Sequence, residues 1–156
     1  MKKFFIILII MTNQLHSEIE NDSLEVAYLA GGCYWGLEEL IRQIPGVLNT
    51  EVGFSGGHVN NVSYKEVTRG DTGHAESIKI EFDTKKLTFE ALLFNFFTMH
   101  NPTTINQQGN DKGTQYRSSI FYYNEKQKTI AQEVIDVVNK SKKWVNPVIT
   151  EIIAFT

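Results

Sequence analysis

Short strand and helix patterns alternate along most of this chain, and their order limits the folds that it can adopt. Apolar residues at 37, 40, 41 and 44 follow i, i+3, i+4, i+7 spacing, which predicts a helix. Residues 77–82 alternate polar and apolar side chains, which predicts a strand with one buried face. By the same criteria we expect strands over 24–30, 47–54, 77–82, 116–123 and 148–155, and helices over 33–44, 64–67, 89–99 and 125–140.

This order, β-α-β followed by β-α-β-α-β, predicts an α+β fold. We expect a two-layer sandwich with a mixed or antiparallel sheet and helices packed on it. A doubly wound parallel sheet is the alternative, but the alternation in 77–82 favours a sheet with one solvated face. Thr88 and Asn124 are the expected N-caps of the helices that follow them. The polar segment 101–114 is predicted to be a long functional loop.

The composition is typical of one folded domain, and it argues against nucleic acid and metal ions as partners. The chain has 156 residues, 42% of them hydrophobic and 21% charged, which is enough apolar material for a core and excludes disorder. Its net charge is −3 and its Lys and Arg residues form no cluster, so we expect no binding to nucleic acid. The His and Cys residues lack the spacing of zinc ligands, and we expect no metal.

The N-terminus has the pattern of a targeting segment. Lys2 and Lys3 precede the apolar run 4–11, and polar residues follow at once, which predicts a signal peptide over residues 1–17. The run is shorter than the ~20 apolar residues that span a bilayer. We therefore expect an exported protein, periplasmic or secreted, with its domain at 24–156. A cytoplasmic protein with an apolar N-terminus is the alternative.

Cys33, the only cysteine, lies where a predicted strand gives way to a helix through Gly31 and Gly32. A helix N-terminus stabilises an anion, and the thiolate is the nucleophilic form of cysteine. Tyr34 and Trp35 follow directly, and their rings are expected to form an apolar cup beside the sulfur. The position therefore suits a catalytic nucleophile, although a small core residue in a tight turn explains it equally well.

Acidic and phenolic residues elsewhere complete the list of candidates. Glu76 stands at the start of a strand, where burial raises the pKa of a carboxyl and makes it a general acid near neutral pH. Tyr64, Asp111 and Tyr116 are expected to bind a polar leaving oxygen or to orient a water molecule. His74 offers another interpretation, because a Cys–His pair is typical of a cysteine hydrolase. An exposed Glu76 at a strand end is the non-functional alternative.

Four short motifs follow one another along the chain. Residues 31–36 are Gly-Gly-Cys-Tyr-Trp-Gly and residues 54–57 are Phe-Ser-Gly-Gly. Residues 70–76 are Gly-Asp-Thr-Gly-His-Ala-Glu, and residues 109–118 are Gly-Asn-Asp-Lys-Gly-Thr-Gln-Tyr-Arg-Ser. In composition and order these motifs resemble the signatures of the class A peptide methionine sulfoxide reductases, and the resemblance extends over about residues 28–120. The family fold is a two-layer α+β sandwich that resembles the ferredoxin-like pattern.

The resemblance implies a mechanism and a role for each candidate. Attack on the sulfur of the S epimer of methionine sulfoxide would leave a sulfenic acid, which is reversible. An external thiol such as thioredoxin would then restore the enzyme, without a cofactor. The implied substrates are oxidised proteins or peptides and free methionine sulfoxide, and the expected state is a monomer. The implied roles are Cys33 as nucleophile, Glu76 as acid, Tyr64, Tyr116 and Asp111 at the sulfoxide oxygen, and Tyr34, Trp35 and Phe54 around the substrate methyl.

The sequence departs from the family pattern at several points. Tyr34 replaces the usual Phe, Phe54 replaces the usual Tyr, and Asn101 stands between His and Pro where the family has Asp. Family members usually continue past the last strand with a tail that often carries resolving cysteines, and we expect this domain to lack it. A single cysteine implies direct reduction by an external thiol. The alternative function is a truncated, non-catalytic domain that binds methionine sulfoxide or Met-rich peptides.

Overall fold

A computed structural model of the chain describes residues 23–156. The predicted signal peptide, residues 1–17, lies outside the described residues. The elements are β1 (Leu24–Gly31), α1 (Tyr34–Ile41), β2 (Val47–Ser55), α2 (Tyr64–Val67), β3 (Ala75–Asp83), α3 (Phe89–Met99), β4 (Gln107–Gln108), β5 (Asp111–Lys112), the 3-10 helix η2 (Thr114–Tyr116), β6 (Ser118–Tyr122), α4 (Glu125–Lys140) and β7 (Glu151–Ala154).

One mixed sheet forms the centre of the fold. Its five strands have the order β2-β3-β1-β6-β7, and β4 and β5 pair separately as a short hairpin. The pairs β2–β3, β1–β3 and β1–β6 are antiparallel, whereas β6–β7 is parallel. The predicted α+β class with a mixed sheet is therefore confirmed, and the doubly wound parallel alternative is wrong.

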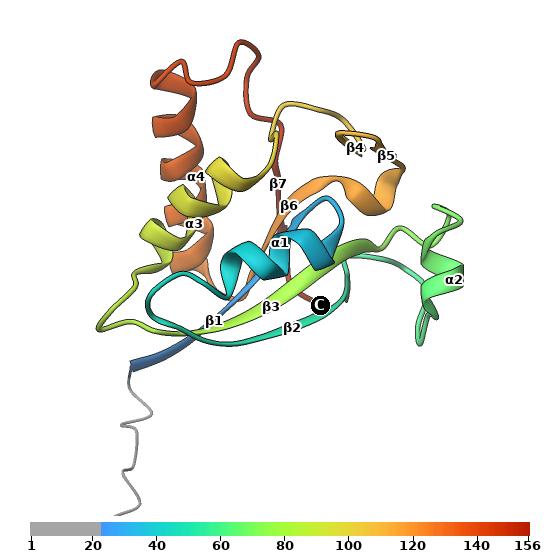
Figure 1. Cartoon of the computed structure of the whole chain (residues 1–156), viewed down its shortest axis with the longest axis horizontal. Coiled ribbons are helices and arrows are strands. Elements are labelled where there is room, and N and C mark those ends of the chain that lie inside the picture. Colours follow the sequence, from blue (N-terminus) through green and yellow to red (C-terminus); the bar gives the residue numbers. More distant parts are fainter. Residues whose placement is uncertain (1–22) are drawn as a thin grey trace, which may run out of the picture.

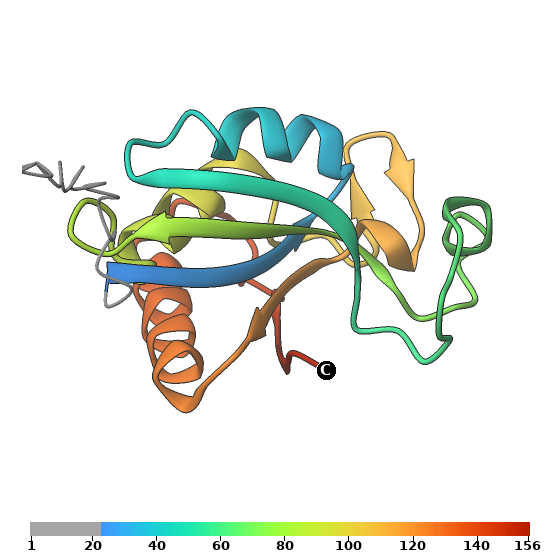
Figure 2. The ribbon, with the colours of Figure 1, turned by 90° about the horizontal axis from the view of Figure 1, so that it is seen from below.

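The three longer helices share one core with one face of the sheet. Alternation along the strands directs Leu29, Ile80 and Ile120 toward this core, and none of them is exposed. From the helices, Leu37 of α1 and Leu92 of α3 pack into the same cluster. Helices α3 and α4 lie against each other, while α1 lies along β2 (Figures 1 and 2). On the opposite face a smaller cluster surrounds Ala30, Ala75 and Phe121.

Strand β3 differs from the simple alternation that its sequence predicts. From Ile78 to Phe82 the apolar side chains are buried and the intervening polar ones are partly exposed, as expected. At its start, however, Ala75, Glu76 and Ser77 are all buried. The reason is position, because β3 lies between β1 and β2 and its first residues are covered on both faces. The alternative of an exposed strand-end Glu76 is thereby excluded.

The segment after α3 contains more structure than its sequence predicts. Within residues 101–116 the chain forms the β4–β5 hairpin and then η2, and Tyr116 belongs to η2 rather than to the following strand. The last strand is also shorter than predicted, because β7 pairs only with residues 119–122 of β6. Both predicted N-caps are confirmed: the side chain of Thr88 accepts from the amide of Ala91, and that of Asn124 accepts from the amide of Gln127. Among residues 23–156, no helix has the length and apolar character to cross a membrane.

Candidate active site

Cys33 occupies the N-cap position of α1, two residues after the end of the β1 ladder. Its carbonyl oxygen accepts a hydrogen bond from the amide of Leu37 at 3.3 Å, and its side chain is partly exposed. Gly32 has a φ of +106°, a backbone conformation that favours glycine, so this residue makes the sharp turn possible. The thiol thus belongs to the N-cap residue of a helix, as the sequence predicts.

Glu76 reaches the same helix N-terminus from β3. It lies on the helix-covered face of the sheet, as Ile78 does, and it is only 1% exposed. Its Oε2 accepts a hydrogen bond from the backbone N–H of Tyr34, the residue after Cys33, at 3.1 Å. Burial raises the pKa of Glu76, the Tyr34 hydrogen bond opposes this rise, and the charge of Asp111 adds to it. The carboxyl is thus suited to hold a proton beside the thiol.

Tyr34 of α1 and Tyr116 of η2 interact electrostatically with this carboxyl, and Tyr64 of α2 interacts with both of these tyrosines. Burial raises the pKa of Tyr116, and the charges of Glu76, Tyr64 and Asp111 raise it further. Burial is also the main cause of the raised pKa of Tyr34, followed by Glu76, Tyr64, Cys33 and Tyr116. The structure thus brings the predicted titratable residues together from five separate elements.

Helix α2 stands away from the helical layer and carries Tyr64 at its first position (Figure 1). Because the helix has only four residues, its N-terminus depends on a capping box. The side chain of Glu66 accepts from the backbone N–H of Ser63 at 2.8 Å and from the Ser63 hydroxyl at 2.7 Å. Tyr64 is 53% exposed, but the capped helix holds its backbone in place.

Aromatic side chains form a continuous wall next to Cys33. The ring centroids of Tyr34 and Phe54 are 5.9 Å apart, and those of Phe54 and Tyr64 are 6.5 Å apart. Trp35 stacks at 6.3 Å from Tyr34 and is 69% exposed, so it lies at the open rim. Phe54 pairs with Glu76 across the β2–β3 ladder, which places the wall and the carboxyl together.

His74 is directed to a different segment. Its Nε2 forms a hydrogen bond with the carbonyl of Val59 at 2.8 Å, and its ring packs against Gly57. Glu76, by contrast, bonds the residue adjacent to Cys33. This geometry supports a Cys–Glu arrangement and gives no support to a Cys–His hydrolase.

Comparison with known proteins decides the family. The model of the family described as "Peptide methionine sulfoxide reductase" matches residues 25–156. The chain belongs to this family. The resemblance inferred from the motifs is therefore confirmed, as are the prediction of an oxidoreductase and its reaction, the reduction of methionine sulfoxide. The alternative of a non-catalytic binding domain is not favoured.

Individual relatives agree with the family match. A peptide methionine sulfoxide reductase MsrA of Methanosarcina acetivorans is 46% identical over 136 residues, which cover 87% of this chain and 72% of the relative. Reduced Mxr1 of Saccharomyces cerevisiae superposes with a TM-score of 0.81 at 32% identity, covering 88% of this chain and 79% of the yeast chain. Mxr1 in complex with Trx2 superposes with a TM-score of 0.64 at 21% identity, covering 88% and 80%, and shows the fold alone.

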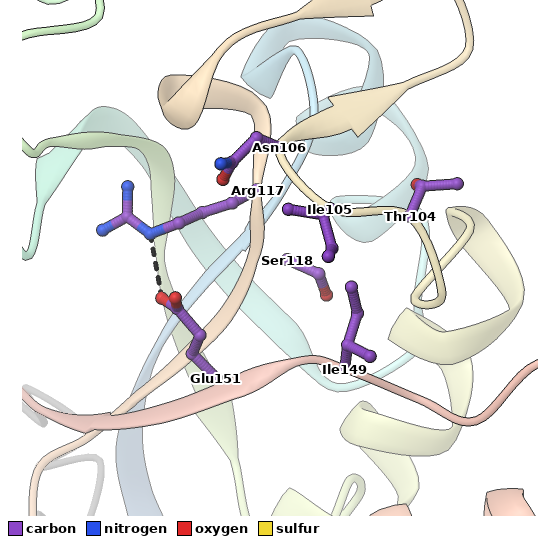
Figure 3. Close-up of a pocket in the computed structure, with 7 residues that line it drawn as sticks. All are labelled: Thr104, Ile105, Asn106, Arg117, Ser118, Ile149 and Glu151. Atoms are coloured by element: carbon purple, nitrogen blue, oxygen red, sulfur yellow. Dashed lines mark hydrogen bonds and ion pairs between the residues drawn. The ribbon is translucent and has the colours of Figure 1, made fainter.

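In this reductase Arg117, which the sequence did not single out, connects three segments next to the site. Its Nη1 donates to the carbonyl of Thr114 and its Nη2 to that of Gly73, both at 3.0 Å, and its Nε is 2.9 Å from Glu151 (Figure 3). It thereby joins η2, the start of β3 and β7. The sequence shows Arg117 directly after Tyr116 in the fourth motif, but it does not show which residues Arg117 bonds.

The cavity drawn in Figure 3 is separate from the reductase site. It has a volume of about 290 Å³ and contains neither Cys33 nor Glu76 in its lining. Its lining residues are Thr104, Ile105, Asn106, Arg117, Ser118, Ile149 and Glu151. Within residues 23–156, no group of three or more His, Cys, Asp or Glu side chains is placed to hold a metal ion.

Proposed function

We propose that this chain reduces the S epimer of free and peptide-bound methionine sulfoxide, with Cys33 as the nucleophile and Glu76 as the general acid. One observation carries the proposal. The buried Glu76 carboxyl is hydrogen-bonded to the first residue of α1, directly after Cys33, so a proton donor and a thiol meet at one helix N-terminus. The family supplies the reaction, and this geometry supports the assignment of roles.

The reaction needs both groups because the sulfoxide oxygen is a poor leaving group. The Cys33 thiolate attacks the sulfoxide sulfur while Glu76 protonates the oxygen. The protonated oxygen leaves the substrate sulfur as hydroxide, and hydroxide then attacks Sγ of Cys33, which breaks the bond between the two sulfur atoms and releases methionine. The sulfoxide is thereby reduced by two electrons, and Cys33 is oxidised to a sulfenic acid. Burial raises the pKa of Glu76, which favours the protonated form that this step requires.

The remaining residues bind the two ends of the sulfoxide. Tyr64 and Tyr116 donate hydrogen bonds to the oxygen, and the raised pKa of Tyr116 keeps its phenol protonated. The negative charge of Asp111 raises the pKa of Glu76 and so favours its acidic form. On the other side, Tyr34, Trp35 and Phe54 surround the substrate methyl with apolar surface.

Regeneration of Cys33 uses an external thiol in this proposal. Two thiols reduce the sulfenic acid and yield the Cys33 thiol, one disulfide and water. Cys33 is the single cysteine in the sequence, so the second and third sulfur atoms come from another molecule. A thioredoxin-like protein is the proposed reductant, which agrees with the crystallisation of yeast Mxr1 in complex with Trx2. No cofactor takes part.

We also infer that the protein acts as a monomer after export. The basic start and the apolar run of residues 4–11 support export through a cleaved signal peptide. The proposed substrates are then proteins that carry oxidised methionine outside the cytoplasm.

Reduction of racemic methionine sulfoxide with dithiothreitol tests the proposed function. We expect wild-type protein to consume one epimer, the S form, while Cys33→Ser consumes neither because the nucleophile is lost. Chiral separation of the remaining sulfoxide measures the result. Folded wild-type protein that consumes neither epimer, or a Cys33→Ser variant that keeps its activity, would contradict the proposal.

A further inference from the structure

The turn that presents Cys33 has side chains close on both sides. A Cβ added to Gly31 would lie 2.9 Å from Cε2 of Phe96 and 3.0 Å from Cγ of His100. One added to Gly32 would lie 2.7 Å from Cγ of Gln108. The two glycines are therefore held between the end of α3 on one side and Gln108 on the other.

The side chain of Gln108 is itself held by the backbone of one residue, Asn101. The amide of Asn101 donates to Oε1 of Gln108 at 2.9 Å, and Nε2 of Gln108 donates to the carbonyl of Asn101. A side chain bonded through both ends of its amide keeps a single rotamer. Its Cβ and Cγ consequently form a rigid surface against Gly32.

His100, the neighbour of Asn101, connects this contact to the sheet. Its Nδ1 donates to the carbonyl of Phe96 at 2.9 Å, so its Nε2 accepts from the hydroxyl of Ser118 at 2.7 Å. Ser118 is the ladder partner of Gly31. The contacts therefore close a ring through Gly31, Ser118, His100, Asn101, Gln108 and Gly32.

We propose that Gln108 is a positioning residue that holds the Gly31–Cys33 turn, and so the sulfur, in its reactive place. This inference rests on the proposed role of Cys33. Gln108 also pairs with Asp111 across the β4–β5 hairpin. Because Asp111 acts electrostatically on Glu76, the hairpin locates the nucleophile and the environment of the acid together.

Single-turnover reduction of methionine sulfoxide without a reductant tests this role. We expect Gln108→Ala to lower the rate of methionine formation about tenfold or more, because small displacements of a reacting atom slow chemistry strongly. The half-saturating sulfoxide concentration should change less than the rate, since Phe54 of β2 and Tyr64 of α2 are not part of the turn. Gln107→Ala is the matched control, because its amide donates to the Gly109 carbonyl at the surface, and it should keep the wild-type rate.

Gln108→Met separates packing from hydrogen bonding and serves if Gln108→Ala fails to fold. It keeps a side chain over Gly32 and loses both bonds to Asn101. An intermediate rate is expected, whereas a wild-type rate in folded Gln108→Met and Gln108→Ala would overturn the proposal.

Alkylation of Cys33 by iodoacetamide supplies a readout that needs no substrate. We expect alkylation at neutral pH to slow about threefold or more in Gln108→Ala, because a displaced thiol loses the favourable field of the helix N-terminus. Equal alkylation rates in Gln108→Ala and Gln107→Ala would overturn the positioning role. If wild-type protein reduces no sulfoxide but alkylation still slows, the proposed function fails while the positioning role stands.

Discussion

At the scale of single residues, Glu76 shows how one carboxyl serves function at a cost to stability. It is 1% exposed and accepts a hydrogen bond from the backbone N–H of Tyr34. Burial therefore raises its pKa more than that bond lowers it. A folded-state pKa above the unfolded value means that the folded chain binds more protons between the two values. Stability must then fall as pH rises through this window.

Glu76→Gln separates the two effects. We expect the variant to lose about 100-fold or more in kcat for sulfoxide reduction, because a side-chain amide cannot transfer a proton to the leaving oxygen. Its Oε1 still accepts from Tyr34, and no charge is buried at high pH. Its free energy of unfolding at pH 8, measured by urea titration, should equal or exceed that of the wild type. A clear loss of stability at pH 8 would show that the carboxylate is stabilising and that its pKa is not raised.

At the scale of elements, one buried histidine joins α3 to two strands. His100 bonds the carbonyl of Phe96 in α3 and the hydroxyl of Ser118 in β6, and Ser118 in turn contacts the hydroxyl of Thr150 beside β7 at 2.7 Å. Burial lowers the pKa of His100 to about 4 from its ordinary 6.5. Above this value the imidazole is neutral, which matches the donor and acceptor roles that its two partners require.

The depressed pKa of His100 predicts a loss of stability in acid. The unfolded chain takes up the proton below pH 6.5, whereas the folded chain does so only near pH 4, so stability falls as pH drops across this range. The full change is of the order of 3 kcal/mol. His100→Gln should remove this dependence, which urea titrations of both proteins from pH 4 to 7 would measure. The contribution of Glu76 has the opposite sign, but it is present in both proteins and cancels in their difference. Parallel curves of unfolding free energy against pH would contradict the prediction.

At the scale of the whole molecule, the candidate site adjoins the core, and Tyr34 belongs to both. The long helices and the helix-facing strand residues form a single core. The candidate site gathers at one end, where α1, α2, β3, β5 and η2 each contribute side chains. The chemistry thus rests on loops and element ends that a large core holds in place.

Export and assembly are predictions for the whole chain. Expressed from its own start codon in a Gram-negative host, the protein should appear in the periplasm without residues 1–17, as intact-mass spectrometry would show. A variant with Leu8→Asp and Ile9→Asp interrupts the apolar run and should stay unprocessed in the cytoplasm. Light scattering of the purified protein should give the mass of a monomer. Full-length protein in the cytoplasm, or a stable dimer, would contradict these predictions.

Local sequence determined the elements and the position of the nucleophile. Helix α3 begins after Thr88 and α4 after Asn124, because capping depends on residues within one turn. Gly32 before Cys33 similarly marked the change from strand to helix, since the turn lies within a few residues. Helices, caps and this turn were predictable because short-range geometry determines them.

Tertiary structure alone decided which distant residues meet. The bond from Tyr34 to Glu76 spans 42 positions and that from Arg117 to Gly73 spans 44, and no local pattern encodes either pairing. The burial of Glu76 on both sides and the contact of Gln108 with Gly32 likewise depend on the strand order and on the β4–β5 hairpin. Sequence alone named the reacting groups, because their chemistry belongs to residue types. Their environments required the fold, because burial and long-range hydrogen bonds exist only once the strands and helices are packed together.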